Sequence, residues 1–409
     1  MNLLTRRVRS GVVLMAASLM TGLLGASPAA GAVSAAPAVG DPDQRVASRT
    51  APRPAVGHDL PLVIAHRGAS GYRPEHTLAA YRLAIRMGAD YVEPDLVSTK
   101  DGVLVARHEN EISGTTDVAS HPEFADRRTT KTIDGLRVTG WFTEDFTLAE
   151  LKTLRAKERL PDVRPDNTRY DGRFEVPTLH EVLELVEQEG RRRGQVVGVY
   201  PETKHPTYFD SIGLSLEEPL VETLRRHGLN RPNAQVFVQS FETRNLRELD
   251  RRLRVPIVQL IAITGAPYDL VASGDDRTYD DLVTPAGLRE ISTYADAIGP
   301  DKNRVIPLDA DGFMTSPTSL VDDAHSAGLT VHPYTFRDEN QFLPADCRRG
   351  SDPNAKGDAF CEYDAFFDAG VDGVFSDYAD TALEAREFWQ DRAQRTSAHR
   401  TGASLHPVQ

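Results

Sequence analysis

Apolar and polar residues alternate along the middle of this chain in blocks whose period changes from one block to the next. Short runs rich in β-branched and aromatic residues fit buried strands, and the runs between them repeat apolar residues every three to four positions, as amphipathic helices do. The strands are predicted at Leu62–His66, Tyr91–Val97, Val196–Glu202, Val236–Phe241, Pro256–Ala262, Ala295–Gly299, Thr330–Phe336 and Gly373–Ser376.

Helix start and stop signals support this interpretation of the pattern. The segments Thr178–Glu181 and Thr147–Glu150 both match a capping box ahead of an apolar stripe, and Gly328 fits the end of a helix just before a strand. Strands that alternate with helices pair in a parallel sheet. Eight such units favour an α/β fold of the (β/α)8 TIM-barrel type, although counting alone does not exclude an open sheet.

One long stretch interrupts the alternation. Residues from about 109 to 176 are polar and contain no clean strand–helix unit. We interpret this stretch as an inserted segment after the second strand that lies over the mouth of the barrel. The barrel domain is expected at residues 61–391, with a disordered linker before it at 33–60 and a flexible tail after it at 392–409.

The first 32 residues have the composition of a secretory signal peptide. Arg6, Arg7 and Arg9 precede the apolar run Gly11–Gly25, and Ala30–Ala32 offers a small-residue cleavage site. A membrane anchor is the alternative, but the apolar run is shorter than the ~20 residues that a spanning helix needs. We therefore expect a secreted protein with no stable membrane insertion after the signal is removed.

Composition narrows the classes of partner. The 409 residues carry a formal net charge of −13, and an acidic protein has no general attraction for nucleic acid or for anionic membranes. If the partner is a small phosphate compound, the site must be made locally positive by a metal ion, arginine or lysine. The oligomeric state is left open by the sequence.

The two cysteines, Cys347 and Cys361, lie in a polar loop. In an exported protein two such cysteines are expected to form a disulfide. Two free thiols are the alternative. A metal site is disfavoured, because no second pair of cysteines or histidines lies beside them.

Carboxylates cluster at the ends of two predicted strands. Glu93 and Asp95 are two residues apart, so both side chains project from the same face of their strand, and Glu202 ends the next predicted strand. Carboxylates that close together repel one another unless a cation lies between them. Oxygen ligands of this kind are preferred by Ca²⁺ or Mg²⁺, whereas zinc favours imidazole or thiolate. The sequence therefore predicts one divalent ion at this place.

Three separate motifs carry a family resemblance. The string His66–Thr77, the strand Tyr91–Leu96 and the segment Pro201–Lys204 resemble the secreted and periplasmic glycerophosphodiester phosphodiesterases, over about residues 62–385. The resemblance implies a TIM barrel, a metal held by Glu93, Asp95 and Glu202, and an acid/base pair formed by His66 and His108. This chain departs from the family pattern at Glu109, where the family often has aspartate.

The resemblance also assigns substrate contacts. Arg67 and Lys204 are expected to bind the phosphate, and Phe241 and Tyr334 to wall the substrate pocket. Glu75 is a site residue whose role is left open, with contacts to the glycerol hydroxyls, to metal through water or to the loop itself as the choices. His76 is expected to be structural, at the junction of loop and helix.

These observations predict metal-dependent hydrolysis of glycerophosphodiesters, the deacylated phospholipids, to sn-glycerol 3-phosphate and an alcohol. One alternative keeps the site and changes the substrate to a glycerol-phosphate polymer such as teichoic acid. A second alternative is an exported phosphodiester-binding protein without catalysis, which would be expected to lack one of the two histidines. A barrel glycosidase is disfavoured, because Glu93 and Asp95 on one strand do not flank a bond as an acid and a nucleophile must.

Overall fold

The computed structural model describes residues 60–400. The predicted signal peptide and all but the last residue of the predicted linker lie outside these residues. Within the described part of the chain, no helix combines the length and apolarity that crossing a membrane would take.

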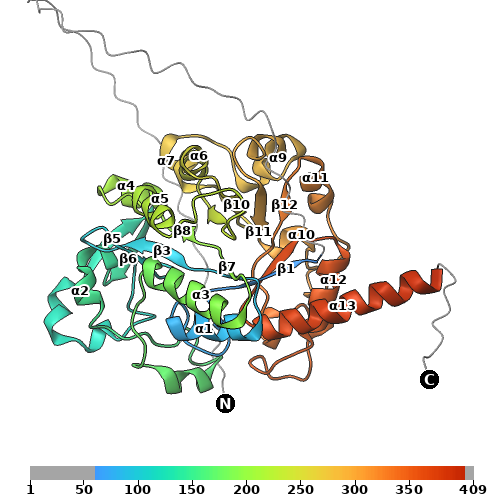
Figure 1. The fold of residues 1–409 in the computed structure, drawn as a ribbon, viewed down its shortest axis with the longest axis horizontal. Coiled ribbons are helices and arrows are strands. Elements are labelled where there is room, and N and C mark those ends of the chain that lie inside the picture. The colour runs from blue at the N-terminus through green and yellow to red at the C-terminus, as the bar shows by residue number, and fades with distance from the viewer. Residues whose placement is uncertain (1–59, 401–409) are drawn as a thin grey trace, which may run out of the picture. The chain divides into compact units, whose positions relative to one another are not determined.

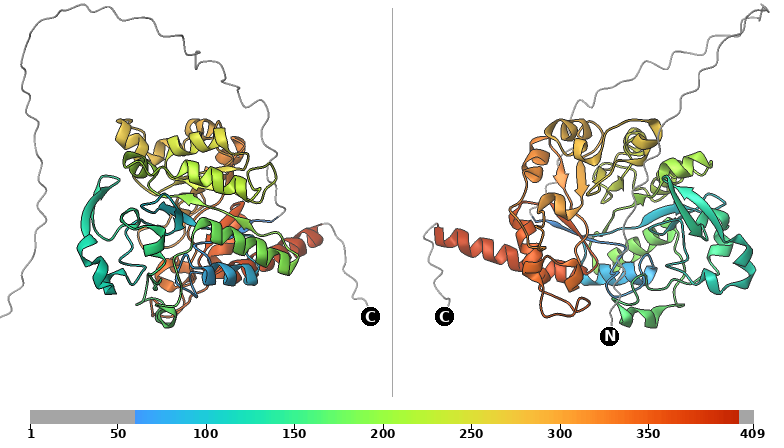
Figure 2. Two further views of the ribbon diagram at one scale, coloured as in Figure 1. Left: turned by 60° about the vertical axis from the view of Figure 1, so that its left-hand side comes forward. Right: turned by 180° about the vertical axis from the view of Figure 1, so that it is seen from behind.

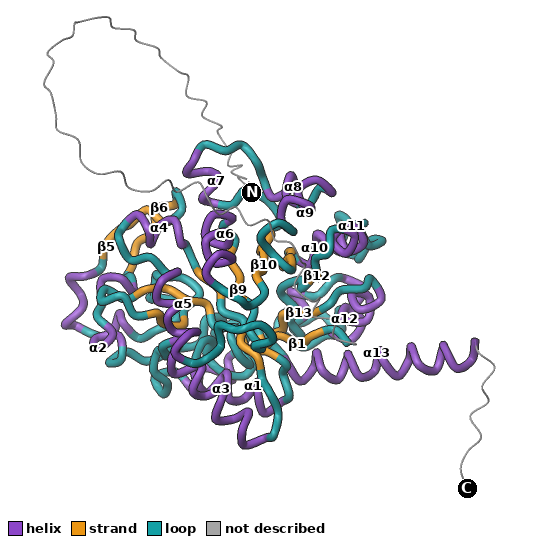
Figure 3. The backbone as a smooth tube through the Cα atoms, turned by 45° about the horizontal axis from the view of Figure 1, so that its top comes forward, coloured by secondary structure: helices purple, strands orange, loops and turns teal. Residues whose placement is uncertain are grey.

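Eight strand positions form a closed ring of parallel strands (Figures 1 and 3). Hydrogen-bonded neighbours run β13-β1-β2-β7 and β12-β11-β10-β9-β8-β3, and the ring closes where Phe336, beyond β12, pairs with Ser376 of β13. The predicted TIM barrel is confirmed. The strands are β1 (Leu62–Ala65), β2 (Tyr91–Val92) with β3 (Asp95–Ser98), β7 (Gly198–Val199) with β8 (Glu202–Thr203), β9 (Val238–Ser240), β10 (Ile257–Ile261), β11 (Ala297–Pro300), β12 (Thr330–Val331) and β13 (Gly373–Ser376).

The second and third strand positions are each split in two, where the sequence predicts continuous strands. The breaks fall at Pro94 and Pro201, whose nitrogens carry no hydrogen to donate to the sheet. Both strands resume in parallel register, with Asp95 opposite Glu202. The alternation of side chains therefore survives the break, and the predicted carboxylates still face the same side.

Helices cover the outside of the barrel (Figure 3). Both predicted capping boxes are present, at the starts of α2 and α3. The helices are α1 (Leu78–Met87), α2 (Leu148–Leu151), α3 (Leu179–Arg193), α4 (Pro206–Ser211), α5 (Glu217–Arg226), α6 (Thr243–Arg252), α7 (Tyr268–Ser273), α8 (Tyr279–Leu282), α9 (Pro285–Ile291), α10 (Lys302–Val305), α11 (Leu320–Ser326), α12 (Ala359–Asp368) and α13 (Ala379–Arg400).

The inside of the barrel is packed with side chains. A buried cluster separate from the layer between strands and helices fills it, and Gly198 makes room for it, since a Cβ there would lie 2.1 Å from the ring of Tyr91. Because the interior is full, a site can form only at an end of the barrel. The cluster consists of Leu62, Ile64, Tyr91, Tyr200, Phe237, Val258, Ala297 and Phe375.

The predicted insertion is a compact segment beside the barrel (Figure 2). The strand β4 (Leu104–Ala106) turns back antiparallel to β3, and the hairpin of β5 (Thr129–Ile133) and β6 (Leu136–Gly140) follows among short 3-10 turns. Arg164 of this segment reaches Asp377, directly after β13. This part of the insertion therefore reaches the carboxyl end of β13.

The C-terminal end differs from the prediction. Residues 392–400 continue helix α13, where the sequence predicts a flexible tail from residue 392 (Figure 1). Arg392 donates hydrogen bonds to Asp364 and Asp368 at 2.7 and 2.8 Å, which tie this part of α13 to α12. The sequence pattern concealed the helix because residues 392–400 are mostly polar and show no apolar repeat.

Cys347 and Cys361 form the predicted disulfide, which closes a loop with a sequence separation of 14 residues. Replacing both cysteines by alanine is expected to lower the free energy of unfolding by about 3 kcal/mol, because the unfolded chain regains the entropy of the open loop. Denaturant unfolding of both proteins measures the difference. Thiol titration of the denatured, unreduced protein is expected to find no free thiol, and two free thiols would contradict the pairing.

Candidate active site

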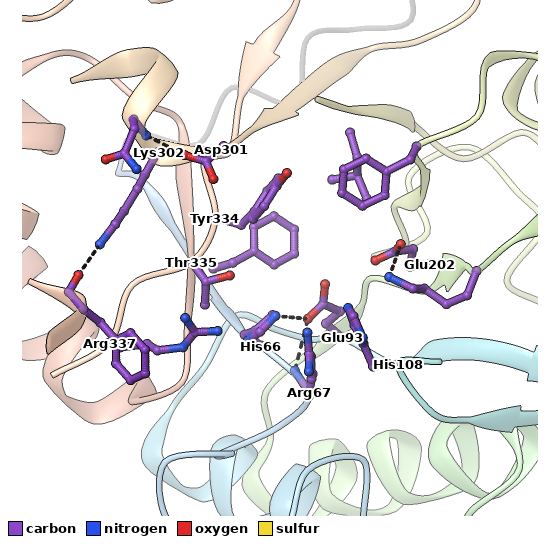
Figure 4. Close-up of a pocket in the computed structure, with 16 residues that line it drawn as sticks. His66, Arg67, Glu93, His108, Glu202, Asp301, Lys302, Tyr334, Thr335 and Arg337 are labelled. Atoms are coloured by element: carbon purple, nitrogen blue, oxygen red, sulfur yellow. Dashed lines mark hydrogen bonds and ion pairs between the residues drawn. The ribbon is translucent and has the colours of Figure 1, made fainter. Parts of the chain in front are cut away.

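A cavity of about 370 Å³ opens at the carboxyl ends of the barrel strands (Figure 4). The strands bring together residues that are far apart in the sequence, which is how a TIM barrel builds a site. Eight of the predicted site residues line it, seven from five different strand ends and one from the turn after β4. These residues are His66, Arg67, Glu93, His108, Glu202, Lys204, Phe241 and Tyr334.

The three predicted metal ligands come together here: Glu93 and Glu202 line the cavity, and Asp95 lies beside them without lining it. One carboxylate oxygen from each of Glu93, Asp95 and Glu202 lies within 4.8 Å of the others, and all three residues are buried. Oδ1 of Asp95 is buried without a hydrogen-bond partner. Such an atom is costly unless something positive contacts it. The donor set is all oxygen and fits a hard divalent cation.

The electrostatics of the cluster lead to the same conclusion. Burial and the neighbouring Asp95 raise the pKa of Glu93 well above its ordinary value, and burial raises the pKa of Glu202 to about 7. Burial acts on Asp95 too, but His76 and Lys204 outweigh it and hold the pKa of Asp95 low. The protein surroundings alone therefore do not keep all three buried carboxylates ionised. A bound cation would favour the ionised form of all three.

His76 supports this cluster from behind. Its Nε2 lies 3.0 Å from Oδ2 of Asp95, its Nδ1 lies 2.7 Å from the hydroxyl of Tyr81, and it is fully buried. A histidine held at both nitrogens fixes the carboxylate that it contacts. The predicted structural role is consistent with this position.

His66 is held by a carboxylate that the sequence analysis leaves unassigned. Its Nδ1 lies 2.6 Å from Oδ1 of Asp377, and its Nε2 lies 3.9 Å from Oε2 of Glu93, on the cavity side. Burial and the charge of Arg67 lower the pKa of His66 to about 4. The imidazole is therefore neutral near pH 7 and able to accept a proton.

His108 is arranged in the same way. Its Nδ1 lies 2.7 Å from Oε2 of Glu109, the position at which this chain departs from the family pattern. Burial, Arg67 and Lys204 lower the pKa of His108 well below its ordinary value. Each histidine thus has one nitrogen engaged by a carboxylate and the other left for chemistry in the cavity.

Two cations flank the carboxylates. Arg67 adopts a left-handed backbone with φ of 59°, its own N–H donates to Glu93 at 3.1 Å, and its guanidinium lines the cavity. Nζ of Lys204 lies 2.8 Å from Oε1 of Glu202. Both cations lie beside the carboxylate cluster, and their binding of a phosphate stays a prediction.

Glu75 is not positioned for the predicted direct contact with substrate. It is absent from the lining of the cavity, and its carboxylate accepts hydrogen bonds from Arg67 at 3.0 Å and from Arg159 at 2.7 Å. Of the choices left open by the sequence, the geometry supports the one in which Glu75 holds its loop. Because the Glu75 carboxylate is engaged by Arg67 and Arg159, it orients the guanidinium of Arg67 from the side away from the cavity.

Phe241 and Tyr334 form an apolar wall of the cavity. Their rings meet edge to face with centroids 5.9 Å apart, and Nζ of Lys204 lies 5.6 Å from the centroid of Phe241. An apolar surface beside the cations gives the non-phosphate part of a ligand a place to pack. Contact of these rings with substrate stays a prediction.

Several residues of the site escaped the sequence analysis. Asp377 and Arg337 each follow a predicted strand directly, so their position at a strand end was a usable signal. Arg159 and Arg164 lie in the insertion, where no period or motif marks them. Only the folded structure shows that they reach the site.

Comparison with known proteins gives a consistent result. The profile of the glycerophosphoryl diester phosphodiesterase family matches residues 66–381. A glycerophosphodiester phosphodiesterase of Arabidopsis thaliana is 38% identical over 334 residues, which cover 78% of this chain and 84% of that protein. The corresponding protein of Haemophilus influenzae is 30% identical over 345 residues, covering 79% of this chain and 89% of that protein.

Solved structures support the fold. One from Silicibacter pomeroyi aligns with a TM-score of 0.57 at 22% identity, covering 82% of this chain and 96% of that one. A phosphodiesterase of Oleispira antarctica, solved in complex with the product sn-glycerol-3-phosphate, aligns with a TM-score of 0.52 at 23% identity, covering 80% and 97%.

Proposed function

Because the chain belongs to the glycerophosphoryl diester phosphodiesterase family, we propose that its hydrolysis of glycerophosphodiesters depends on a divalent metal ion, Ca²⁺ or Mg²⁺, and yields sn-glycerol 3-phosphate and an alcohol. The observation that carries this proposal is the convergence of three buried carboxylates, two carboxylate-held histidines and two cations on one cavity.

The metal would be held by Glu93, Asp95 and Glu202, where it would polarise the phosphate and stabilise the charge that develops on its oxygens. Arg67 and Lys204 bind the remaining phosphate oxygens from the same side of the cavity. Burial of these cations strengthens their attraction for an anion, because little water remains to screen it.

The two histidines supply the proton transfers. Breaking the P–O bond requires a base for the attacking hydroxyl and an acid for the leaving oxygen. His66 and His108 both line the cavity, and each is held at Nδ1 by a carboxylate, so each offers Nε2 to the reacting groups. One of the pair takes the proton from the nucleophile, and the other, once protonated at Nε2, delivers that proton to the leaving oxygen of the alcohol.

The presence of both histidines argues against a protein that only binds phosphodiesters. The glycerol-phosphate polymer is the second candidate substrate. An assay of glycerophosphocholine beside a glycerol-phosphate polymer, each with and without chelator, separates the two. We expect faster release of sn-glycerol 3-phosphate from the small diester, and a faster release from the polymer would favour the alternative.

We further propose that the protein is exported and works outside the cytoplasm. The support is the signal-like composition of residues 1–32 together with the Cys347–Cys361 disulfide, a pairing that persists in oxidising compartments. Fractionation of the native producer, with detection of the processed N-terminus in the culture medium, tests this proposal.

Recognition of the glycerol moiety gives a separate prediction. Phe241 and Tyr334 are expected to pack against glycerol while the alcohol leaves through the open mouth. A diester that lacks glycerol is therefore expected to react far more slowly, since the groups of the site that hydrogen-bond the glycerol hydroxyls would be left unpaired. Comparison of kcat/KM for glycerophosphocholine and bis(p-nitrophenyl) phosphate measures this, and comparable values would contradict the glycerol pocket.

A further inference from the structure

Arg159, from the insertion, holds two carboxylates at once. Its guanidinium donates to Glu75 twice at 2.7 Å, and to Glu109 at 2.7 and 2.9 Å. Glu109 holds Nδ1 of His108, and Glu75 holds the guanidinium of Arg67. Arg159 is thus connected through these two carboxylates to His108 and Arg67, which both line the cavity.

Arg164, five residues further along the same segment, does the equivalent for the other histidine. Its Nη2 donates to Oδ2 of Asp377 at 2.6 Å, and its Nε donates to Glu339 at 2.6 Å. Oδ1 of Asp377 lies 2.6 Å from Nδ1 of His66. Arg337 also donates to Asp377, at 2.8 Å, so this carboxylate is fixed from two sides.

The segment that carries both arginines is itself anchored to the barrel. Arg164 and Asn167 donate to the carbonyl of Ser70, in the loop after β1, at 3.1 and 3.4 Å. Asn167 also donates to Glu158 at 3.0 Å, and Arg164 is only 7% exposed. Residues 158–167 therefore form a fixed support beside the site.

We propose that residues 158–167 of the insertion are a positioning element for the reaction, which sets His108 and Arg67 through Arg159 and His66 through Arg164. This inference rests on the proposed function. The planar fork of arginine holds a carboxylate in a fixed plane by paired hydrogen bonds, and the carboxylate in turn fixes the imidazole that it contacts. Because both histidines depend on one segment, the acid and the base are oriented together.

Replacing each of the two arginines by alanine is expected to change kcat and KM differently. Arg164→Ala is expected to lower kcat by about 10²-fold with little change in KM, since a small misplacement of His66 slows the chemical step. Arg159→Ala is expected to lower kcat and also to raise KM, because it holds Arg67 as well as His108. Arg169→Ala is the control, since this exposed arginine lies just beyond residues 158–167, packs on the ring of Tyr170 and touches none of these carboxylates.

Two further measurements separate positioning from a merely structural role. Millimolar guanidinium chloride, but not sodium chloride, is expected to restore part of the lost kcat of each alanine variant by occupying the vacated place. When His66 is already alanine, adding Arg164→Ala is expected to lower kcat further by less than about twofold. Adding Arg159→Ala to the same variant is expected to lower kcat as much as it does in the wild-type protein. Where an alanine variant does not fold, the lysine variant, which keeps the charge but not the fork, is used and is expected to lose rate while folding.

The proposal is overturned if both variants keep wild-type kcat, or if Arg164→Ala costs as much without His66 as with it. A failure of the proposed function is distinct from either outcome, because it would be seen first in the wild-type protein, which would not hydrolyse glycerophosphocholine at all.

Discussion

Replacing His66 or His108 by alanine is expected to lower kcat by about 10²–10⁴-fold, the usual contribution of a positioned general acid or base. Each imidazole lines the cavity with Nδ1 engaged by a carboxylate, Asp377 or Glu109. Each substitution removes one proton-transfer group and leaves the carboxylate cluster in place. Steady-state kinetics with glycerophosphocholine measure the loss.

The matched control for these variants is His332→Ala. His332 is also buried, in contact with Tyr200 inside the barrel, but it does not line the cavity. We expect this variant to lose stability and to keep most of its turnover once folded. Near wild-type turnover in either His66→Ala or His108→Ala would remove that histidine from the mechanism.

Removal of the divalent ion is expected to abolish hydrolysis, with Ca²⁺ or another hard divalent ion restoring it. Glu93→Gln is expected to weaken ion binding severely, because a neutral amide replaces a charged ligand beside Asp95 and Glu202. Calorimetric titration with Ca²⁺ measures the affinity independently of turnover.

Glu217→Gln provides the comparison for the ligand substitution. Glu217 is buried, and its carboxylate accepts from Asn245 on the outer helices, away from the cavity. We expect this variant to bind Ca²⁺ as the wild-type protein does. Equal affinity of Glu93→Gln and wild type for the ion would mean that Glu93 is not a ligand.

The sequence was sufficient for the barrel because each strand carries its own local signal. The strands β1 and β13 pair with each other only in the folded barrel. Each can nevertheless be recognised in the sequence from its own apolar, β-rich run. The breaks at Pro94 and Pro201 left the side-chain alternation intact. The spacing of Glu93 and Asp95 predicted that both side chains project from the same face, and their carboxylates do lie close together.

What the sequence could not show depends on contacts between distant segments. Arg159 and Arg164 are two arginines among many in a polar stretch, and only folding brings them to Glu109 and Asp377. The orientation of the Glu75 side chain was not predictable, since one of the two arginines that engage its carboxylate, Arg159, lies 84 residues away in the sequence. The helical end of α13 escaped because ion pairs hold it rather than an apolar stripe.

The most direct test of metal-dependent hydrolysis is the identity of the products that the metal-stripped protein forms from glycerophosphocholine before and after Ca²⁺ is added back. Metal-dependent hydrolysis predicts no reaction without the ion, and equal amounts of sn-glycerol 3-phosphate and choline once the ion is restored. Full activity in the stripped protein, or release of phosphocholine and glycerol, would contradict it.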